Sequence, residues 1–260
     1  MIRYVLLGLV QGLTEFLPVS SSGHLVLAER WLGLDSPGVL LEAMLHWGTL
    51  AAILIVFRKD IVALLKSLRG KGSVERRKEV GFLIAGTVPI VVAALLFRET
   101  IQSAFSSLLA VGIGLLLTAL VLTLGHLARA RVRRPSIRFL DAVVVGLAQA
   151  AAVFPGISRS GVTISAGTAM GLSAADAVRF SFLLAIPALL GAGLLHLLDV
   201  INASGSQNWL GILIGTLCAF GSGWLALRAV LRLVRQGRLW IFAVYCFLVG
   251  AGTIVWSILY

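Results

Sequence analysis

A polar segment occurs twice in this otherwise apolar chain. Residues 8–23 recur as residues 146–161, an offset of 138 (146 minus 8), and seven positions are identical in the two copies. The identical pairs are Gly8/Gly146, Leu9/Leu147, Gln11/Gln149, Phe16/Phe154, Ser20/Ser158, Ser22/Ser160 and Gly23/Gly161. A broken polar segment at corresponding positions of two halves is typical of the binding site in inverted-repeat membrane proteins. The duplication therefore predicts two related halves that meet at one site.

The composition restricts the chain to the membrane. Apolar residues make up 59% of it and charged residues 13%, and the mean hydropathy is +1.01. A soluble globule cannot cover so much apolar surface. At roughly 20 apolar residues per span, 260 residues allow about six spans. We therefore expect an all-α polytopic membrane protein in which residues 1–260 form a single integral membrane domain.

The basic residues are clustered between the apolar runs. The net charge of +11 could indicate a nucleic-acid partner, but 17 of the 22 lysines and arginines lie in three short connectors. Residues 58–79 hold eight, residues 129–138 hold five and residues 228–238 hold four. Basic connectors favour the cytoplasmic side, so the pattern predicts a membrane topology and no nucleic-acid partner. Both ends of the chain are expected on the opposite side.

Six apolar runs are expected to span the membrane. They lie at about residues 40–57, 80–97, 105–128, 174–199, 208–227 and 239–258. The two copies of the repeat fall outside these runs, in residues 1–34 and 137–171.

Each copy of the repeat is interrupted near its centre. Pro18 divides the first copy, and Pro155 with Gly156 divides the second, into arms of about 12–16 residues. Helices of that length reach about 18–24 Å, short of a hydrocarbon core of roughly 30 Å. We therefore expect two re-entrant helix hairpins, and a continuous kinked span is the alternative.

Three spans separate the two hairpins, and an odd number of crossings inverts the second copy. Repeat one is expected to cover residues 1–128 and repeat two residues 137–258. The first hairpin would enter from outside and the second from the cytoplasm, so that their tips meet near the midplane.

The tips carry residues that favour an anion. Ser20-Ser21-Ser22 and Ser158-Arg159-Ser160 supply N-cap residues for the second arm of each hairpin. A helix N-terminus with unpaired N–H groups and serine hydroxyls suits a phosphate, and the guanidinium fork of Arg159 matches phosphate oxygens. Close packing of small residues is the alternative role for the serines, and a structural cation is the alternative for Arg159.

The first copy alone adds reactive groups. Gln11 and Glu15 are four residues apart, so one helix face presents both, and Glu15 could ligate a divalent cation or accept a proton. His24 follows Ser21 by three residues, which places a nucleophile beside a base. A structural polar network that ties the hairpins together is the alternative.

Two further pairs are weaker candidates. Glu42 and His46 share a helix face and could line the mouth of the site, or form an interfacial pair. Asp176 and Arg179 are three residues apart, and we expect them to form a structural ion pair.

The motifs together resemble a known family. Two runs carry the resemblance: one from Gln11 through Glu15 to His24, and one from Pro155 through Arg159 to Thr163. Together they are similar to the paired signature of the bacterial undecaprenyl-diphosphate phosphatases, also known as bacitracin-resistance proteins. The likeness extends over the whole chain in length, number of spans and basic connectors.

The resemblance implies an inner-membrane hydrolase. It would remove the terminal phosphate of undecaprenyl diphosphate, recycle the lipid carrier for peptidoglycan synthesis and confer bacitracin resistance. The count of basic connectors, rather than the resemblance, predicts that the site opens to the periplasmic side. A divalent cation, magnesium or calcium, is implied, and no oligomeric state is predicted.

The resemblance also assigns roles to residues. It implies catalytic roles for Glu15, Ser21, His24 and Arg159. It implies phosphate binding by Ser158, Ser160 and Thr163, to which the tip chemistry adds Ser20 and Ser22. Glu15 is the expected metal ligand, with Gln11 beside it at a position where the family carries Glu or Gln.

Two mechanisms and two rival functions stay open at the level of sequence. Ser21 could attack the terminal phosphorus, or His24 and Glu15 could activate water. A transporter (flippase) of undecaprenyl phosphate and a non-catalytic lipid-binding scaffold are the rivals. The asymmetry of the copies favours the hydrolase, because a carrier needs no serine beside a histidine in one copy only.

Overall fold

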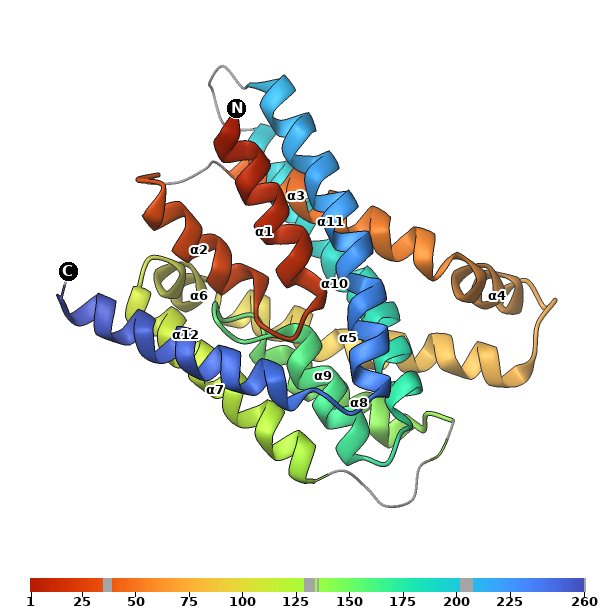
Figure 1. Ribbon diagram of the computed structural model, residues 1–260. Helices are drawn as coiled ribbons and strands as arrows, with labels where there is room; N and C mark the ends of the chain where they lie inside the picture. Colours follow the sequence, from red (N-terminus) through yellow and green to blue (C-terminus); the bar gives the residue numbers. More distant parts are fainter. Residues whose placement is uncertain (35–38, 129–133, 135, 202–207, 260) are drawn as a thin grey trace.

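The computed structural model describes residues 1–260 except 35–38, 129–133, 135, 202–207 and 260. The described residues form twelve helices and no strand beyond an isolated bridge between Arg134 and Leu172 (Figure 1). In chain order the helices are α1 (Ile2–Phe16), α2 (Ser21–Trp31), α3 (Val39–Val56), α4 (Arg58–Leu68), α5 (Val74–Leu96), α6 (Arg98–Phe105), α7 (Leu108–Leu127), α8 (Phe139–Ala151), α9 (Arg159–Ala169), α10 (Ala174–Ile201), α11 (Trp209–Arg235) and α12 (Trp240–Leu259).

The helices long and apolar enough to cross a membrane are α5, α7, α10, α11 and α12. α3 and α4 meet this criterion as a pair, but they bend by 77° where they join, so they form a broken span or a re-entrant loop. The prediction of an all-α polytopic protein with about six spans is confirmed among the described residues.

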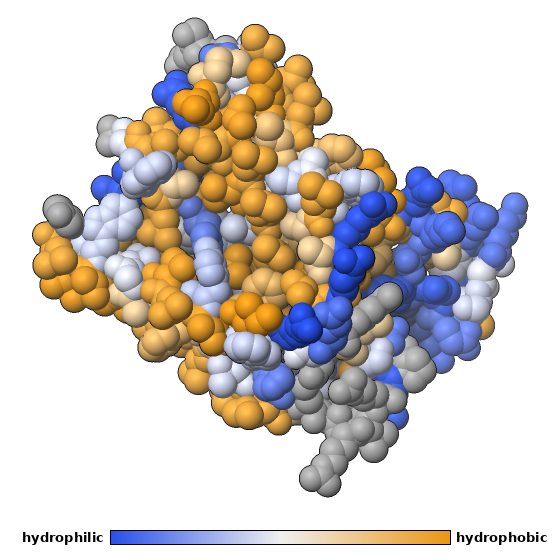
Figure 2. All heavy atoms as spheres, in the orientation of Figure 1, coloured by the Kyte–Doolittle hydropathy of each residue, from blue (hydrophilic) through white to orange (hydrophobic). Residues whose placement is uncertain are grey.

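The basic stretch 58–79 is largely helical, although its charges predict a connector. It contains α4 and the first turns of α5, and the Ser73 hydroxyl caps α5 by accepting from the Arg76 N–H at 3.3 Å. The apolar side chains of α4 recur at helical spacing, at Ile61, Leu64, Leu65 and Leu68. Figure 2 shows hydrophilic surface gathered over α4 and the start of α5, and apolar surface over most other helices in view.

Both copies of the repeat break where the prolines predict. α1 and α2 are separated by residues 17–20, and α8 and α9 by residues 152–158. Ser20 and Ser158 are the N-caps of the second arms: Ser20 Oγ accepts from the Gly23 N–H at 3.4 Å, and Ser158 Oγ accepts from the Gly161 N–H at 3.1 Å. The arms hold 15 and 11 residues in the first copy and 13 and 11 in the second. The re-entrant insertion and the inverted orientation stay predictions.

Equivalent glycines pack in equivalent ways in the two halves. α1 packs on α11, and α8 packs on α5. A Cβ added at Gly8 would lie 2.3 Å from the Gly215 carbonyl oxygen, and one at Gly146 would lie 2.6 Å from the Gly86 carbonyl oxygen. The same position of the repeat therefore permits the same close backbone approach in each half.

An arginine closes the base of the second hairpin. Arg134 donates to both carboxylate oxygens of Asp141 at 2.7 and 2.8 Å and to the Met170 carbonyl at 2.6 Å. The hydrogen bonds to Asp141 raise the pKa of the Arg134 guanidinium above its ordinary value. The start of α8 and the end of α9 are thereby held together.

The core holds the first tip in place. Phe16, at the end of α1, is fully buried and packs edge-to-face on Phe182 of α10, with ring centroids 5.6 Å apart. Glu15 directly precedes this anchored ring, so core packing fixes the position of the carboxylate.

Gly8→Ala is expected to destabilise the protein by about 1–3 kcal/mol, because the new methyl group would meet the backbone of α11. Gly221→Ala, on α11 itself, meets nothing within 4 Å and is the matched control. Thermal unfolding of the detergent-solubilised variants measures the difference. Equal melting temperatures for the two variants would contradict the close-approach role of Gly8.

Candidate active site

The end of α1 supplies an amide and a carboxylate that face the same way. Gln11 is fully buried and Glu15 is 7% exposed, and Gln11 Nε2 donates to Glu15 Oε2 at 3.0 Å. The spacing of four residues places both on one helix face, as the sequence predicts.

The Ser21 hydroxyl, at the first position of α2, lies against this carboxylate. Its Oγ donates to Glu15 Oε2 at 2.5 Å. A hydroxyl that donates to a carboxylate is the arrangement of a nucleophile with its base. Of the two bases that the sequence offers for Ser21, the structure places Glu15 beside it.

Arg159 completes the group from the other half of the chain. Its Nη2 donates to Glu15 Oε1 at 2.5 Å, and the two side chains are 13% and 4% exposed. Ser160 Oγ donates to the Leu17 carbonyl at 3.3 Å, and a Cβ added at Gly23 would lie 3.1 Å from Gly156 Cα. The two tips therefore meet, and small residues let them approach closely.

The serines form the same pair in both tips. Ser20 Oγ and Ser22 Oγ are 3.2 Å apart, and Ser158 Oγ and Ser160 Oγ are 3.3 Å apart. Each pair lies at a helix N-terminus, where the first N–H groups have no partner within the helix. The two tips thus carry matched serine pairs at the starts of α2 and α9.

Thr163 lies deeper than the serines. Its hydroxyl donates to the Arg159 carbonyl at 2.7 Å and pairs with Ser181 Oγ of α10 at 2.6 Å. These contacts tie α9 to α10, and the phosphate-binding role of Thr163 stays a prediction.

His24 has partners other than Ser21. Its Nδ1 lies 2.8 Å from the Ser20 carbonyl oxygen, and because a carbonyl only accepts, Nδ1 carries the proton. Its Nε2 lies 2.7 Å from the Tyr245 hydroxyl of α12, and the two rings stack at 5.6 Å with 10° between their planes. His24 is therefore held with its Nε2 turned to α12.

Sequence reasoning missed three contacts of the site. Tyr245 holds His24, Ser181 holds Thr163, and Thr118 of α7 accepts from the Ser158 N–H at 2.9 Å. A tyrosine inside an apolar span was the available signal, because a tyrosine hydroxyl at membrane depth usually has a partner.

Two weaker candidates have partners that the spacing did not predict. The prediction of an ion pair between Asp176 and Arg179 is wrong. Asp176 accepts a hydrogen bond from the Ser173 hydroxyl. Arg179 forms ion pairs with Asp60 and Glu79 instead. The His46 ring donates from Nδ1 to the backbone carbonyl of Glu42 at 2.8 Å.

The residues present fit a divalent cation that is shared with a substrate. The described residues contain no cluster of three or more His, Cys, Asp or Glu side chains that could hold a metal. Gln11 Oε1 is nevertheless buried without a hydrogen-bond partner, beside the Glu15 carboxylate. Magnesium is commonly held by one or two carboxylates together with substrate phosphates and water.

The fold and the site define a multi-pass membrane protein with a buried carboxylate, hydroxyl and guanidinium between two broken helical segments. A model of the family described as Bacitracin resistance protein BacA matches residues 4–252. The chain is 38% identical to an undecaprenyl-diphosphatase of Halothermothrix orenii, over 97% of this chain and 96% of the relative. It is 42% identical to one of Desulfosudis oleivorans, over 97% of each chain, and 39% identical to undecaprenyl-diphosphatase 1 of Halalkalibacterium halodurans, over 100% of this chain and 96% of the relative. This chain belongs to the BacA family.

Breaking the contact between the tips is expected to be costly. Glu15→Gln or Arg159→Gln leaves one charge buried alone, which should lower the free energy of unfolding by about 3–5 kcal/mol. In the double variant, the loss of unfolding free energy should be smaller than the sum of the two single losses by about 1–3 kcal/mol. Reversible unfolding in mixed micelles measures all three, with the exposed Glu75→Gln as the control. Strict additivity would contradict a direct Glu15–Arg159 interaction.

Tyr245→Phe is expected to change the environment of one histidine nitrogen, because it keeps the stacked ring and removes the hydroxyl from His24 Nε2. The chain has four histidines, so nitrogen NMR of histidine-labelled protein can follow each ring. Tyr4→Phe, on α1, is the control and should leave the spectrum unchanged. An Nε2 signal of His24 that does not move in Tyr245→Phe would contradict the contact.

Proposed function

We propose that this chain hydrolyses undecaprenyl diphosphate to undecaprenyl phosphate and inorganic phosphate. The observation that carries the proposal is the Glu15 carboxylate, which accepts from Ser21 on one oxygen and from Arg159 on the other. Family membership and the names of the relatives support the same activity.

Substrate binding depends on positive charge supplied by the second tip. Arg159 uses one of its five N–H donors on Glu15, which leaves donors for phosphate oxygens. The first turns of α2 and α9 add backbone N–H groups that have no partner within the helix, with the Ser20–Ser22 and Ser158–Ser160 pairs beside them. Neutralising the charge on the transferred phosphoryl group is most of what this reaction requires of a protein.

Ser21 is the nucleophile in the mechanism that we favour. Glu15 Oε2 takes the hydroxyl proton while Ser21 Oγ attacks the terminal phosphorus. The bond from that phosphorus to the bridging oxygen breaks, and undecaprenyl phosphate leaves. Glu15 passes its proton to the departing undecaprenyl phosphate, and the ionised carboxylate then deprotonates a water molecule. The water oxygen attacks the phosphoserine, the bond from phosphorus to Ser21 Oγ breaks, Ser21 Oγ takes the proton back from Glu15, and inorganic phosphate leaves. Direct attack by a water activated by Glu15 is the alternative, and a trapped phosphoserine at position 21 distinguishes the two.

We propose that His24 acts on a group other than Ser21, because its ring nitrogens contact Ser20 and Tyr245. Its protonated Nδ1 is bonded to the Ser20 carbonyl, so Nε2 is the nitrogen that can exchange a proton. Tyr245 contacts that nitrogen at 2.7 Å. We assign His24 to proton transfer at the bridging oxygen or at the incoming water.

A magnesium or calcium ion is the proposed cofactor. Glu15 and the unpartnered Oε1 of Gln11 would hold it. When bound, such an ion supplies positive charge to the diphosphate.

The proposed location is the bacterial cytoplasmic membrane, with the site open to the periplasmic side. The support is the distribution of basic residues, which assigns connectors 58–79, 129–138 and 228–238 to the cytoplasm. In this place the enzyme would recycle the lipid carrier of peptidoglycan synthesis and confer bacitracin resistance.

The differences between the two copies of the repeat favour hydrolysis over transport of the lipid. An offset of 138 places Val153, Arg159 and Val162 opposite Glu15, Ser21 and His24. A carrier that alternates between two faces has no need of a base and a nucleophile in one half only. A transporter of undecaprenyl phosphate is therefore the weaker alternative.

Purified protein is expected to release inorganic phosphate from undecaprenyl diphosphate with magnesium or calcium, and to stop when the cation is chelated. Ser21→Ala and Glu15→Gln should each lower turnover by about 10²–10⁴-fold, because they remove the nucleophile or its base. Arg159→Lys should also be impaired, because an ammonium cannot bind phosphate as a fork.

Ser103→Ala, at an exposed position of α6, is the matched control and should retain turnover. Full activity of Ser21→Ala would exclude the covalent route and leave the water route. Folded wild-type protein that binds the lipid but releases no phosphate with either cation would overturn the proposed activity in favour of transport.

A further inference from the structure

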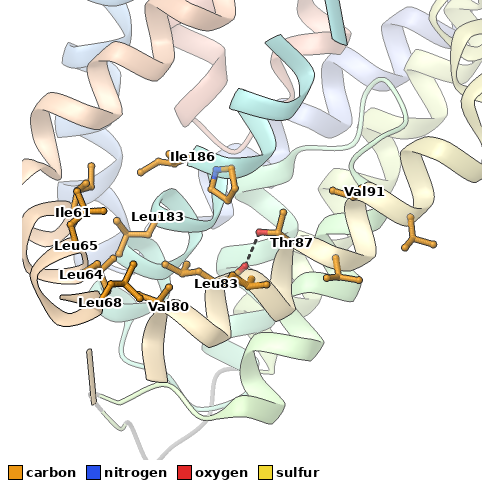
Figure 3. Close-up of a pocket in the computed structure, with 14 residues that line it drawn as sticks. Ile61, Leu64, Leu65, Leu68, Val80, Leu83, Thr87, Val91, Leu183 and Ile186 are labelled. Carbon is orange, nitrogen blue, oxygen red and sulfur yellow. Dashed lines mark hydrogen bonds between the residues drawn. The ribbon is translucent and has the colours of Figure 1, made fainter. Parts of the chain in front are cut away.

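An apolar groove lies between α4, α5 and α10, away from the hairpin tips. Its cavity volume is about 430 Å³, and fourteen residues line it, all apolar except Thr87 (Figure 3). The Thr87 hydroxyl donates to the Leu83 carbonyl at 2.7 Å within α5, so the groove presents no free polar group of its own. A pocket of this size and lining suits a hydrocarbon chain.

The walls of the groove are joined by an ion cluster. Arg179 of α10 donates to Asp60 of α4 at 2.6 Å and to Glu79 of α5 at 2.5 Å. Arg76 of α5 donates to Glu79 at 3.0 Å and lies 3.6 Å from Asp60. The cluster links all three wall helices, so the groove is pre-formed rather than created by a ligand.

The cluster borders one end of the groove directly. Ile61 follows Asp60 and Val80 follows Glu79, and Leu183 lies one helical turn after Arg179. The groove therefore runs from a charged end, along α5, to an apolar end.

Two arginines near this end, Arg69 and Arg77, have no carboxylate partner among the described residues. Leu68 of α4 and Val80 of α5 both line the groove, and both are labelled in Figure 3. Arg69 follows Leu68, and Arg77 precedes Val80 by one helical turn. Both side chains are exposed, and Arg77 uses only Nε in its bond to the Ser67 carbonyl at 3.3 Å.

The surrounding segment keeps a strong positive charge. Residues 58–79 hold eight basic and three acidic residues, a net charge of +5. Two of the acids, Asp60 and Glu79, are already paired within the ion cluster. The remaining charge gives this part of the chain a positive potential that attracts anions.

We propose that the groove binds a hydrocarbon chain of an anionic phospholipid, whose phosphate lies on Arg69 and Arg77. An apolar slot that ends at unpaired arginines matches an amphiphile with a phosphate headgroup, and basic pockets between membrane helices bind such headgroups. The lipid fills a gap that helix packing leaves open and offsets part of the positive charge of α4 and the start of α5.

Other occupants fit the groove less well. A second copy of the chain would bring two segments of charge +5 together, which is unfavourable. The diphosphate substrate reacts on the opposite side of α10, where Ser181 and Phe182 contact the hairpin tips. A neutral lipid would leave the arginines unbalanced.

The test compares lipid binding to the intact detergent-purified protein. Phosphatidylglycerol and phosphatidylcholine with identical chains are added, and bound lipid is counted by native mass spectrometry. Each arginine is expected to contribute about fivefold to the preference for phosphatidylglycerol, the equivalent of about 1 kcal/mol. Arg69→Gln with Arg77→Gln should abolish the preference, and the lysine versions should restore it.

Matched control variants distinguish lipid binding in the groove from general effects of charge and hydrophobicity. Arg232→Gln with Arg238→Gln removes the same charge from another basic connector and should keep the preference. Leu65→Trp with Val88→Trp fills the groove from two exposed positions and should prevent binding. Leu120→Trp with Leu124→Trp, on exposed positions of α7, should leave it unchanged.

Three results would overturn the proposal. They are equal binding of the two lipids, equal loss of preference in both arginine pairs, and unaltered binding to the filled groove. Protein that dimerises only while the groove is open would assign the surface to a second copy instead. None of these results depends on the phosphatase activity.

Discussion

The ion pair between Glu15 and Arg159 is the interaction on which the site depends. A carboxylate among apolar helices is costly unless it is paired and hydrogen-bonded. Glu15 receives donors from Gln11, Ser21 and Arg159, and the last of these comes from the other half of the chain. The pairing that makes the buried charge tolerable therefore also brings the two tips into contact.

Several surrounding helices position this ion pair. Phe16 anchors Glu15 to α10, and Ser181 of α10 holds Thr163 on the second tip. α12 holds the first tip at two adjacent residues, because Tyr245 contacts His24 and Cys246 Sγ lies 3.6 Å from the Pro18 carbonyl. Long-range packing, rather than the hairpins alone, thus sets the positions of the candidate site residues.

The spacing of residues in the sequence predicted the features that depend on local helix geometry. The spans, the breaks at the prolines and the shared face of Gln11 and Glu15 follow from residues close together in sequence. The partner of Arg179 could not be found that way: Asp176 lies at a favourable spacing, but α4 and α5 bring carboxylates to it across the fold. Tyr245 was missed for the same reason, because its contact with His24 spans 221 positions.

In the proposed mechanism, the two copies of the repeat supply different parts of one reaction. Phosphoryl transfer needs an attacking group and a charge that holds the phosphoryl oxygens, approaching from different directions. The first tip carries the hydroxyl and its base, and the second carries an arginine at the position equivalent to Ser21. Because the tips face each other, an anion between them can be attacked from one and held by the other. Two identical tips would supply either two attacking groups or two phosphate-holding charges, and the reaction needs one of each.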